Sequence, residues 1–187
     1  MVLNTQDQGR EMGIRIVALG DAGVGKKSLL TRYTQNRLEE RYLSAVHYNA
    51  DLYVDGKLYS MDALAISDYI MPELRRRVYR LTDVFLICFS PDSPNSYESI
   101  VHRWLPEISE YCPGVPAIIV CCKSDLRSSP TSFLNDESPY VDEDIASELV
   151  GLQSNGIQIK DYLECSAHVN NGIGHVLETA CRVLKNK

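Results

Sequence analysis

The segment from Gly20 to Lys26 reads Gly-Asp-Ala-Gly-Val-Gly-Lys, and its residue types are suited to binding phosphate. Closely spaced glycines let backbone N–H groups turn toward phosphate oxygens, and a helix that begins there adds partial positive charge. The Lys26 ammonium would reach the β- and γ-phosphates of a nucleotide. The candidate phosphate-binding residues are Gly20, Asp21, Ala22, Gly23, Val24, Gly25, Lys26, Lys27 and Ser28.

The residue after Lys26 departs from the usual pattern of such loops, in which a Ser or Thr hydroxyl binds Mg²⁺. Lys27 stands there, and the serine comes one position later, at Ser28. Because a helix turns about 100° per residue, Ser28 cannot present its hydroxyl at the same place. The Lys27 ammonium would repel Mg²⁺, replace part of its charge on the phosphates, or extend into solvent, and the sequence leaves these possibilities open.

The surrounding sequence supplies the elements that must position this loop. The apolar run 14–19 predicts a strand before the loop, and 27–36 predicts a helix after it. Strands alternate with helices along the chain, which indicates an α/β fold with a mostly parallel sheet whose ligands bind at the carboxyl ends of the strands. Further strands are expected at 84–89, at 117–122, at 162–165 and in a hairpin of 52–54 and 58–64; further helices are expected at 72–80, from 94 toward 110, at 142–149 and at 173–184.

Length and composition limit the possible functions. The 187 residues fit one domain, 13–187, behind a flexible arm, 1–12. A net charge of −6 argues against binding a nucleic acid polymer. No apolar run approaches the roughly 18 residues of a membrane helix, and no Cys-a-a-X box ends the sequence, so no membrane anchor is expected in this chain. The six cysteines are expected to be buried free thiols in a reducing compartment, which favours a cytoplasmic location.

An ordered set of motifs over 14–185 resembles the Ras superfamily of small GTPases, and within it most closely the Rho family. The resemblance implies a P-loop small G-domain: a six-stranded, mostly parallel sheet flanked by about five helices, with a Rho-type insert near 127–140. It also implies GTP or GDP as the cofactor and a switch worked by the γ-phosphate. The segments that carry it are Gly20–Leu30, Val54–Lys57, Thr82–Pro94, Trp104–Glu107, Cys112–Pro116, Lys123–Arg127 and Glu164–Ala167.

The resemblance places the guanine base against two short motifs. Asp125 would accept hydrogen bonds from the base, and the stem of Lys123 would lie along it. Cys122 replaces the asparagine of the family pattern and loses a contact to the base and to the phosphate loop. An apolar Leu38 stands where the family has an aromatic ring over the base. The remaining base-side candidates are Leu126, Ser166, Ala167 and His168.

The same resemblance aligns the switch and metal positions with residues that lack the needed oxygen atoms. Ala45 stands for the threonine of switch I, and Ala65 stands for the aspartate of switch II. Asp68 or Tyr69 falls near the place of the water-positioning glutamine, and no equivalent of the switch glycine is evident. Hydrolysis needs Mg²⁺ and a positioned water, so hydrolysis is expected to be absent or very slow, and Mg²⁺ itself is doubtful.

The leading interpretation is a hydrolysis-deficient signalling protein that binds nucleotide weakly or constitutively and contacts effector or regulator proteins through segments 38–48 and 65–80. One alternative is a slow Mg²⁺-dependent GTPase that rebuilds its metal site from Ser28, Ser44 and Asp68. Another is an interaction scaffold without nucleotide. The basic cluster of Arg75, Arg76, Arg77 and Arg80 is interpreted as a solvated helix face balanced by Glu73, or as a surface for an acidic partner or phospholipid.

Overall fold

The computed structural model describes residues 12–35, 45–128, 141, 144, 149, 150, 153, 154 and 156–185. The strands are β1 (Met12–Leu19), β2 (Ala45–Val54), β3 (Lys57–Ile66), β4 (Val84–Phe89), β5 (Pro116–Cys121), β6 (Gln153–Ser154) and β7 (Ile157–Glu164). The helices are α1 (Lys26–Gln35), α2 (Pro72–Tyr79), α3 (Pro94–Ser99), the π-helical turn η1 (Ile100–Trp104), α4 (Leu105–Tyr111), the 3₁₀ turn η2 (Ser124–Ser128) and α6 (Ile173–Lys185).

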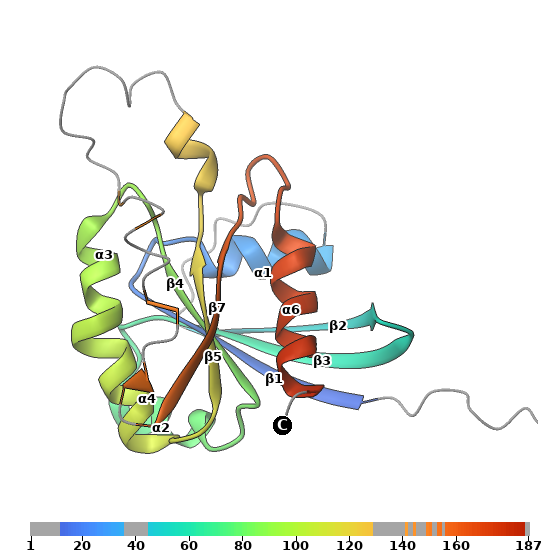
Figure 1. The fold of residues 1–187 in the computed structure, drawn as a ribbon, viewed down its shortest axis with the longest axis horizontal. Coiled ribbons are helices and arrows are strands. Elements are labelled where there is room, and N and C mark those ends of the chain that lie inside the picture. The colour runs from blue at the N-terminus through green and yellow to red at the C-terminus, as the bar shows by residue number, and fades with distance from the viewer. Residues whose placement is uncertain are drawn as a thin grey trace, which may run out of the picture.

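The strands form one sheet in the order β2-β3-β1-β4-β5-β7-β6 (Figure 1). The neighbouring pairs β3 and β1, β1 and β4, β4 and β5, and β5 and β7 are parallel. The pairs β2 with β3 and β6 with β7 are antiparallel. The predicted six-stranded, mostly parallel sheet is therefore confirmed, with the two-residue β6 beside β7 as a short addition. Every residue of β4 and β5 is buried, as expected for central strands covered on both faces.

Two apolar layers cover the two faces of the sheet. One packs α1 and α6 against the sheet, with Leu29 and Leu177 fully buried. The other packs α2 and the α3-η1-α4 helix against the opposite face, with Tyr79 and Trp104 fully buried. Figure 1 shows these helices on the two sides of the central strands. The phosphate loop lies between β1 and α1, at the carboxyl end of β1.

The helix predicted from Pro94 toward Glu110 is continuous through 111 but contains the π-helical turn η1. Pro106, the second residue after this turn, accounts for it, because proline has no N–H to donate and its ring crowds the preceding turn. Ser99, just before the turn, and Trp104, at its end, both contact the phosphate loop.

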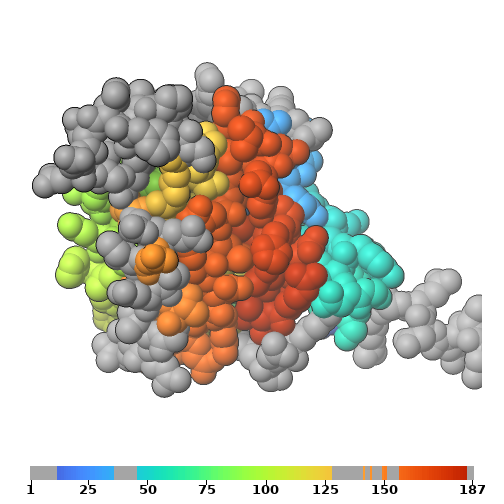
Figure 2. Space-filling view, turned by 45° about the horizontal axis from the view of Figure 1, so that its top comes forward, coloured from blue at the N-terminus to red at the C-terminus, as the bar shows by residue number. Residues whose placement is uncertain are grey.

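The hairpin of β2 and β3 is longer than predicted. It pairs ten residues of each strand, from Ala45 with Ile66 to Val54 with Lys57, around the Asp55-Gly56 turn. Figure 2 shows the hairpin projecting beside α6, and the Arg182–Asp55 ion pair at 3.3 Å joins α6 to the turn. Part of the segment predicted as a switch surface, 45–48, is thus strand, and 38–44 lies outside the described residues.

Two predicted boundaries were wrong. Met12 begins β1 and is not part of the arm predicted at 1–12. The last long strand is β7, eight residues from Ile157, and not the short strand predicted at 162–165, because alternate burial of Ile157 and Ile159 extends it. The insert predicted near 127–140 begins in η2; residues 129–140 and most of the helix predicted at 142–149 lie outside the described residues.

The cysteines behave as predicted: Cys88, Cys112, Cys121, Cys122, Cys165 and Cys181 are all buried free thiols. Within the part of the chain that the structure describes, no helix has both the length and the apolar character needed to cross a membrane.

Candidate functional site

The phosphate loop passes so close to two neighbouring strands that only glycine fits at two of its positions. A Cβ on Gly20, whose φ is +139°, would lie 2.1 Å from the carbonyl oxygen of Cys88. A Cβ on Gly25, with φ +118°, would lie 2.9 Å from the Cβ of Cys122. Gly23 also has a positive φ, of 80°, which L side chains rarely adopt. The loop therefore has the tight, Cβ-free backbone that close approach of a phosphate needs.

Lys26 lies inside this loop. Its Nζ donates hydrogen bonds to the carbonyl oxygens of Gly20 at 2.7 Å and Asp21 at 2.6 Å, and only 5% of the residue is exposed. Burial lowers the pKa of Lys26, because the charged form has lost water. A buried ammonium group surrounded by backbone atoms is suited to binding an anion such as a phosphate.

The other predicted loop residues differ in where their side chains lie. Ala22 is exposed, whereas Val24 is 2% exposed and packs into the core beneath the loop. Lys27 and Ser28 are half-buried in the first turn of α1. Any contact of Ala22 or Val24 with phosphate would therefore be made through the backbone.

Asp21, predicted to contact phosphate, has its carboxylate turned toward the helix that follows β4. Ser99 Oγ donates to Asp21 Oδ2 at 2.7 Å, and the Trp104 indole N–H donates to Oδ1 at 3.0 Å. Asp21 thus ties the phosphate loop to α3 and η1. No local pattern around Asp21 or Trp104 predicts this link, because the two residues are 83 positions apart.

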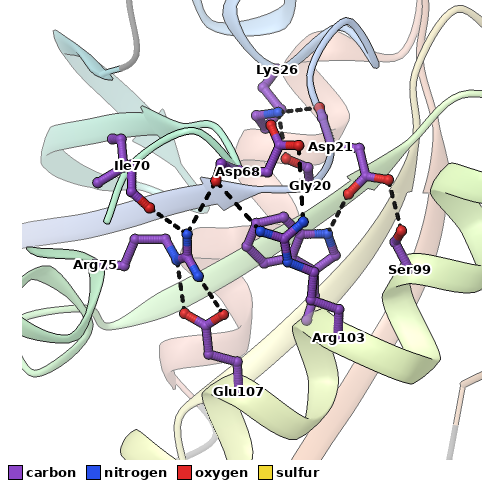
Figure 3. A network of polar contacts seen from close by, with 10 residues as sticks. Gly20, Asp21, Lys26, Asp68, Ile70, Arg75, Ser99, Arg103 and Glu107 are labelled. Atoms are coloured by element: carbon purple, nitrogen blue, oxygen red, sulfur yellow. Dashed lines mark hydrogen bonds and ion pairs between the residues drawn. The ribbon is translucent and has the colours of Figure 1, made fainter. Parts of the chain in front are cut away.

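Asp68 is brought beside the phosphate loop by the segment that follows β3. In Figure 3 its carboxylate lies between the Lys26 ammonium and the Arg103 guanidinium. Asp68 Oδ2 lies 3.9 Å from Arg103, and Oδ1 is buried without a hydrogen bond. The negative charge of Asp68 acts to raise the pKa of Lys26, against the larger effect of burial.

Arg75 corrects the interpretation of the basic cluster as a solvated face. It is 3% exposed and pairs with Glu107 through two hydrogen bonds of 2.8 Å, not with Glu73. Tyr79 donates its hydroxyl to the same carboxylate at 3.0 Å. The hydrogen bond to Glu107 raises the pKa of Arg75, and burial with the negative Glu107 raises the pKa of Tyr79. The ion pair joins α2 to α4.

Asp125, the candidate base-binding carboxylate, is held by a hydrogen bond from the neighbouring strand end. The Ser166 hydroxyl donates to Asp125 Oδ1 and also accepts the N–H of Val169 at 3.2 Å. Lys123 has a positive φ, of 55°, and its ammonium lies 3.6 Å from Asp92. The two predicted base-side motifs, at 123–126 and 166–168, therefore meet at the ends of β5 and β7.

Arg32 of α1 fixes the backbone of the second base-side motif. Its Nε donates to the carbonyl oxygen of Ala167 at 2.8 Å, and a second nitrogen reaches the carbonyl of His168 at 3.5 Å. The His168 side chain is exposed, and Leu126 is half-buried in η2. Arg32 is a site residue that the sequence does not indicate, because its contacts join segments about 135 positions apart.

Cys122 is buried under the phosphate loop between two other thiols. Hydrogen bonding with Cys122, together with burial, raises the pKa of Cys165 and of Cys88. The Cys122 backbone N–H donates to the Phe89 carbonyl at 2.9 Å and continues the β4–β5 pairing. A small thiol thus stands where an amide would bridge the loop and the base.

The positions predicted to have lost metal ligands lie at the ends of β2 and β3. Ala65 is fully buried in β3, and Ala45 begins β2, paired with Ile66. Leu38 lies outside the described residues. Among the side chains that the structure places, no three His, Cys, Asp or Glu residues are grouped as a metal site would need.

Arg127 closes the base side of the site against β7. Its guanidinium pairs with Glu164 at 2.9 Å and donates to the Val141 carbonyl. The Tyr162 hydroxyl also donates to Glu164, at 2.5 Å. These contacts fix η2, the turn that carries Asp125, on the sheet.

Comparison with known proteins agrees with this geometry. The Ras family model matches residues 15–186. The chain is similar to the Rho-related GTP-binding protein RhoB of Homo sapiens, Mus musculus and Rattus norvegicus, at 38% identity over 178 residues in each case. The match covers 92% of this chain and 89% of each relative. The chain therefore belongs to the Ras family of small GTPases and is related to its Rho members.

Proposed function

We propose that this chain is a Rho-like signalling protein that binds guanine nucleotide but hydrolyses GTP very slowly or not at all. Nucleotide binding is supported by the buried Lys26 within the glycine loop and by Asp125, held by Ser166. These residues fit a guanine nucleotide: Lys26 and the loop backbone would hold the phosphates, and Asp125 the base.

The loss of hydrolysis is inferred from the residues that surround the glycine loop and Lys26. Ala65 offers a buried methyl group at the end of β3, and Lys27 offers a cation in the first turn of α1. Neither supplies an oxygen ligand for Mg²⁺. Without the metal, charge on a transferring phosphoryl group is poorly neutralised, and the barrier to hydrolysis stays high.

Effector or regulator proteins would contact the surface around α2 and the β2–β3 hairpin. Large apolar side chains are exposed there, in contrast to the buried Tyr48 and Tyr79. Exposed aromatic and Met side chains are enriched where proteins bind one another. The exposed side chains of this surface are Tyr53, Tyr69, Met71 and Leu74.

The test is the nucleotide content and turnover of the purified protein. We expect retained guanine nucleotide whose release is insensitive to EDTA, and no single-turnover hydrolysis of GTP above the rate in buffer. The matched variant Asp125→Ala should lose guanine binding, because the carboxylate that accepts hydrogen bonds from the base is gone. Binding of neither GTP nor GDP at millimolar concentration would refute the proposal and favour a scaffold without nucleotide.

A second candidate function rests on Asp68. Its buried Oδ1 has no hydrogen bond and could serve as a ligand of a metal ion in a rebuilt site. That function is a slow Mg²⁺-dependent GTPase. Turnover that requires Mg²⁺ and is lost on Asp68→Asn would establish it and would overturn the first proposal.

A further inference from the structure

The Asp68 carboxylate lies close to the phosphate loop. Figure 3 shows it near the Lys26 ammonium, which donates to the carbonyl oxygens of Gly20 and Asp21. Among the described carboxylates, those of Asp68 and Asp21 act on the charge of Lys26, and Asp21 is already engaged by Ser99 and Trp104. Of these two, Asp68 has the oxygen atom without a hydrogen bond, Oδ1.

Two arginines hold the backbone of Asp68 in this place. Arg75 donates to the carbonyl oxygens of Ile70 and Asp68, and Arg103 donates to the same Asp68 carbonyl at 3.4 Å. Arg75 is itself fixed by its paired hydrogen bonds to Glu107. Both arginines come from helices that pack on the sheet. Their hydrogen bonds hold the segment after β3 in place without a bound ligand.

Arg103 offsets the charge of the Asp68 carboxylate only in part. The two groups form an ion pair of 3.9 Å, the arginine is 41% exposed, and its guanidinium also lies over the Trp104 ring, 4.6 Å from the centroid. Asp68 Oδ1 is buried without a hydrogen bond. The Asp68 carboxylate is therefore a local negative charge near the end of the site that Lys26 would share with the last phosphate of a nucleotide.

We propose that Asp68 is a specificity determinant that makes this site select guanosine diphosphate over the triphosphate. The inference rests on the proposed binding of guanine nucleotide. A third phosphate would bring more negative charge beside the Asp68 carboxylate, and Ala45 and Ala65 offer no metal ligand to offset it. A diphosphate keeps the contacts with Lys26 and ends before this carboxylate. The negative charge of Asp68 then repels a third phosphate from the position that it would take.

The test compares the affinities of GDP and GTP for the wild type and for Asp68→Asn, with EDTA and with excess Mg²⁺. Asparagine keeps the size of the side chain and the backbone carbonyl that the arginines hold, and removes only the charge. Like charges at such short range change binding by on the order of 10- to 100-fold, so we expect the preference for GDP to fall by that factor. The control Asp62→Asn removes an equal charge from a half-exposed position on β3 and should leave the ratio unchanged.

Asp68→Ser, which removes the charge and part of the side chain, must shift the ratio in the same direction even if one variant folds less well. An unchanged ratio in both Asp68 variants, with both nucleotides still bound, overturns this inference alone. GTP binding that weakens in Asp68→Asn only when Mg²⁺ is present also overturns it, because Asp68 would then be a metal ligand. Binding of neither nucleotide to the wild type refutes the proposed function, and this inference with it.

Discussion

The indole N–H of Trp104 donates a 3.0 Å hydrogen bond to the carboxylate of Asp21, a residue 83 positions earlier in the chain. Trp104 is completely buried against the sheet, and Asp21 is the second residue of the phosphate loop. The bond makes the shape of the loop depend on the packing of η1. Nucleotide affinity and fold stability should therefore change together when it is lost.

Trp104→Phe should lower the free energy of unfolding by about 1–3 kcal/mol, because the Asp21 carboxylate loses a charge-assisted hydrogen bond. Urea unfolding of Trp104→Phe, of Asp21→Ala and of the double variant measures the coupling between the two residues. Additive effects in this cycle would show that the bond contributes nothing beyond the burial of the ring.

Arg75→Ala should be more damaging than its place in a run of arginines suggests. Removing this guanidinium leaves the Glu107 carboxylate partly buried and without its ion pair, which costs about 3–5 kcal/mol in the free energy of unfolding. Arg77→Ala is the matched control, since Arg77 is exposed on the same helix and should change stability by less than about 0.5 kcal/mol. Equal effects of the two variants in urea unfolding would contradict the role of the Arg75–Glu107 pair.

Tyr79 should make the fold sensitive to alkaline pH. Burial, with the nearby Glu107 charge, raises the pKa of Tyr79 in the folded state, so the unfolded state releases this proton first as the pH rises. The contribution of Tyr79 to stability is thus complete below about pH 10 and declines above it by about 1.4 kcal/mol per pH unit.

Tyr79→Phe removes this titration along with the hydrogen bond to Glu107. The variant should be less stable than the wild type near about pH 8, and the difference should shrink or reverse near about pH 11. Urea unfolding at both pH values measures it, with Tyr53→Phe, at a 74% exposed ring, as the control. A difference that is the same at both pH values would be evidence against a protected Tyr79.

Cys122→Asn should strengthen nucleotide binding. The amide would add a hydrogen bond near the loop and the base, where the thiol now lies against Gly25. One hydrogen bond of about 1 kcal/mol corresponds to roughly a fivefold gain in affinity. Titration of GDP measures the gain, with Cys112→Ser, in the opposite apolar layer, as the control. Unchanged affinity would mean that Cys122 does not limit binding.

Local pattern was enough to predict most of the fold. The apolar runs at 84–89 and 117–122 became β4 and β5 almost residue for residue, because strands buried on both faces need unbroken apolar sequence. The strand at 157–164 was predicted too short, since only alternate residues are buried at its start. The boundaries of half-exposed strands depend on the strand with which they pair. The sequence of the strand alone does not indicate that partner.

The residues of the candidate site also form two groups, those that the sequence indicates and those that only the structure identifies. The glycine loop and Lys26 were proposed as a phosphate site because that chemistry depends on spacing within a few residues. Asp125, Ser166 and Ala65 were singled out only through the resemblance to small GTPases. The residues that fix these groups were not predicted, because each acts across the sheet: Trp104 and Ser99 on Asp21, Arg32 on Ala167, Arg75 and Arg103 on Asp68.

The sequence by itself determined the α/β class and the glycine loop between β1 and α1. Only the tertiary structure decided that Arg75 is a buried ion-pair partner and that Asp68 faces Lys26. Composition and periodicity report which residues avoid water, and short motifs report local backbone geometry. The charge that a side chain meets is set by residues distant in sequence, and these come together only when the helices pack on the sheet.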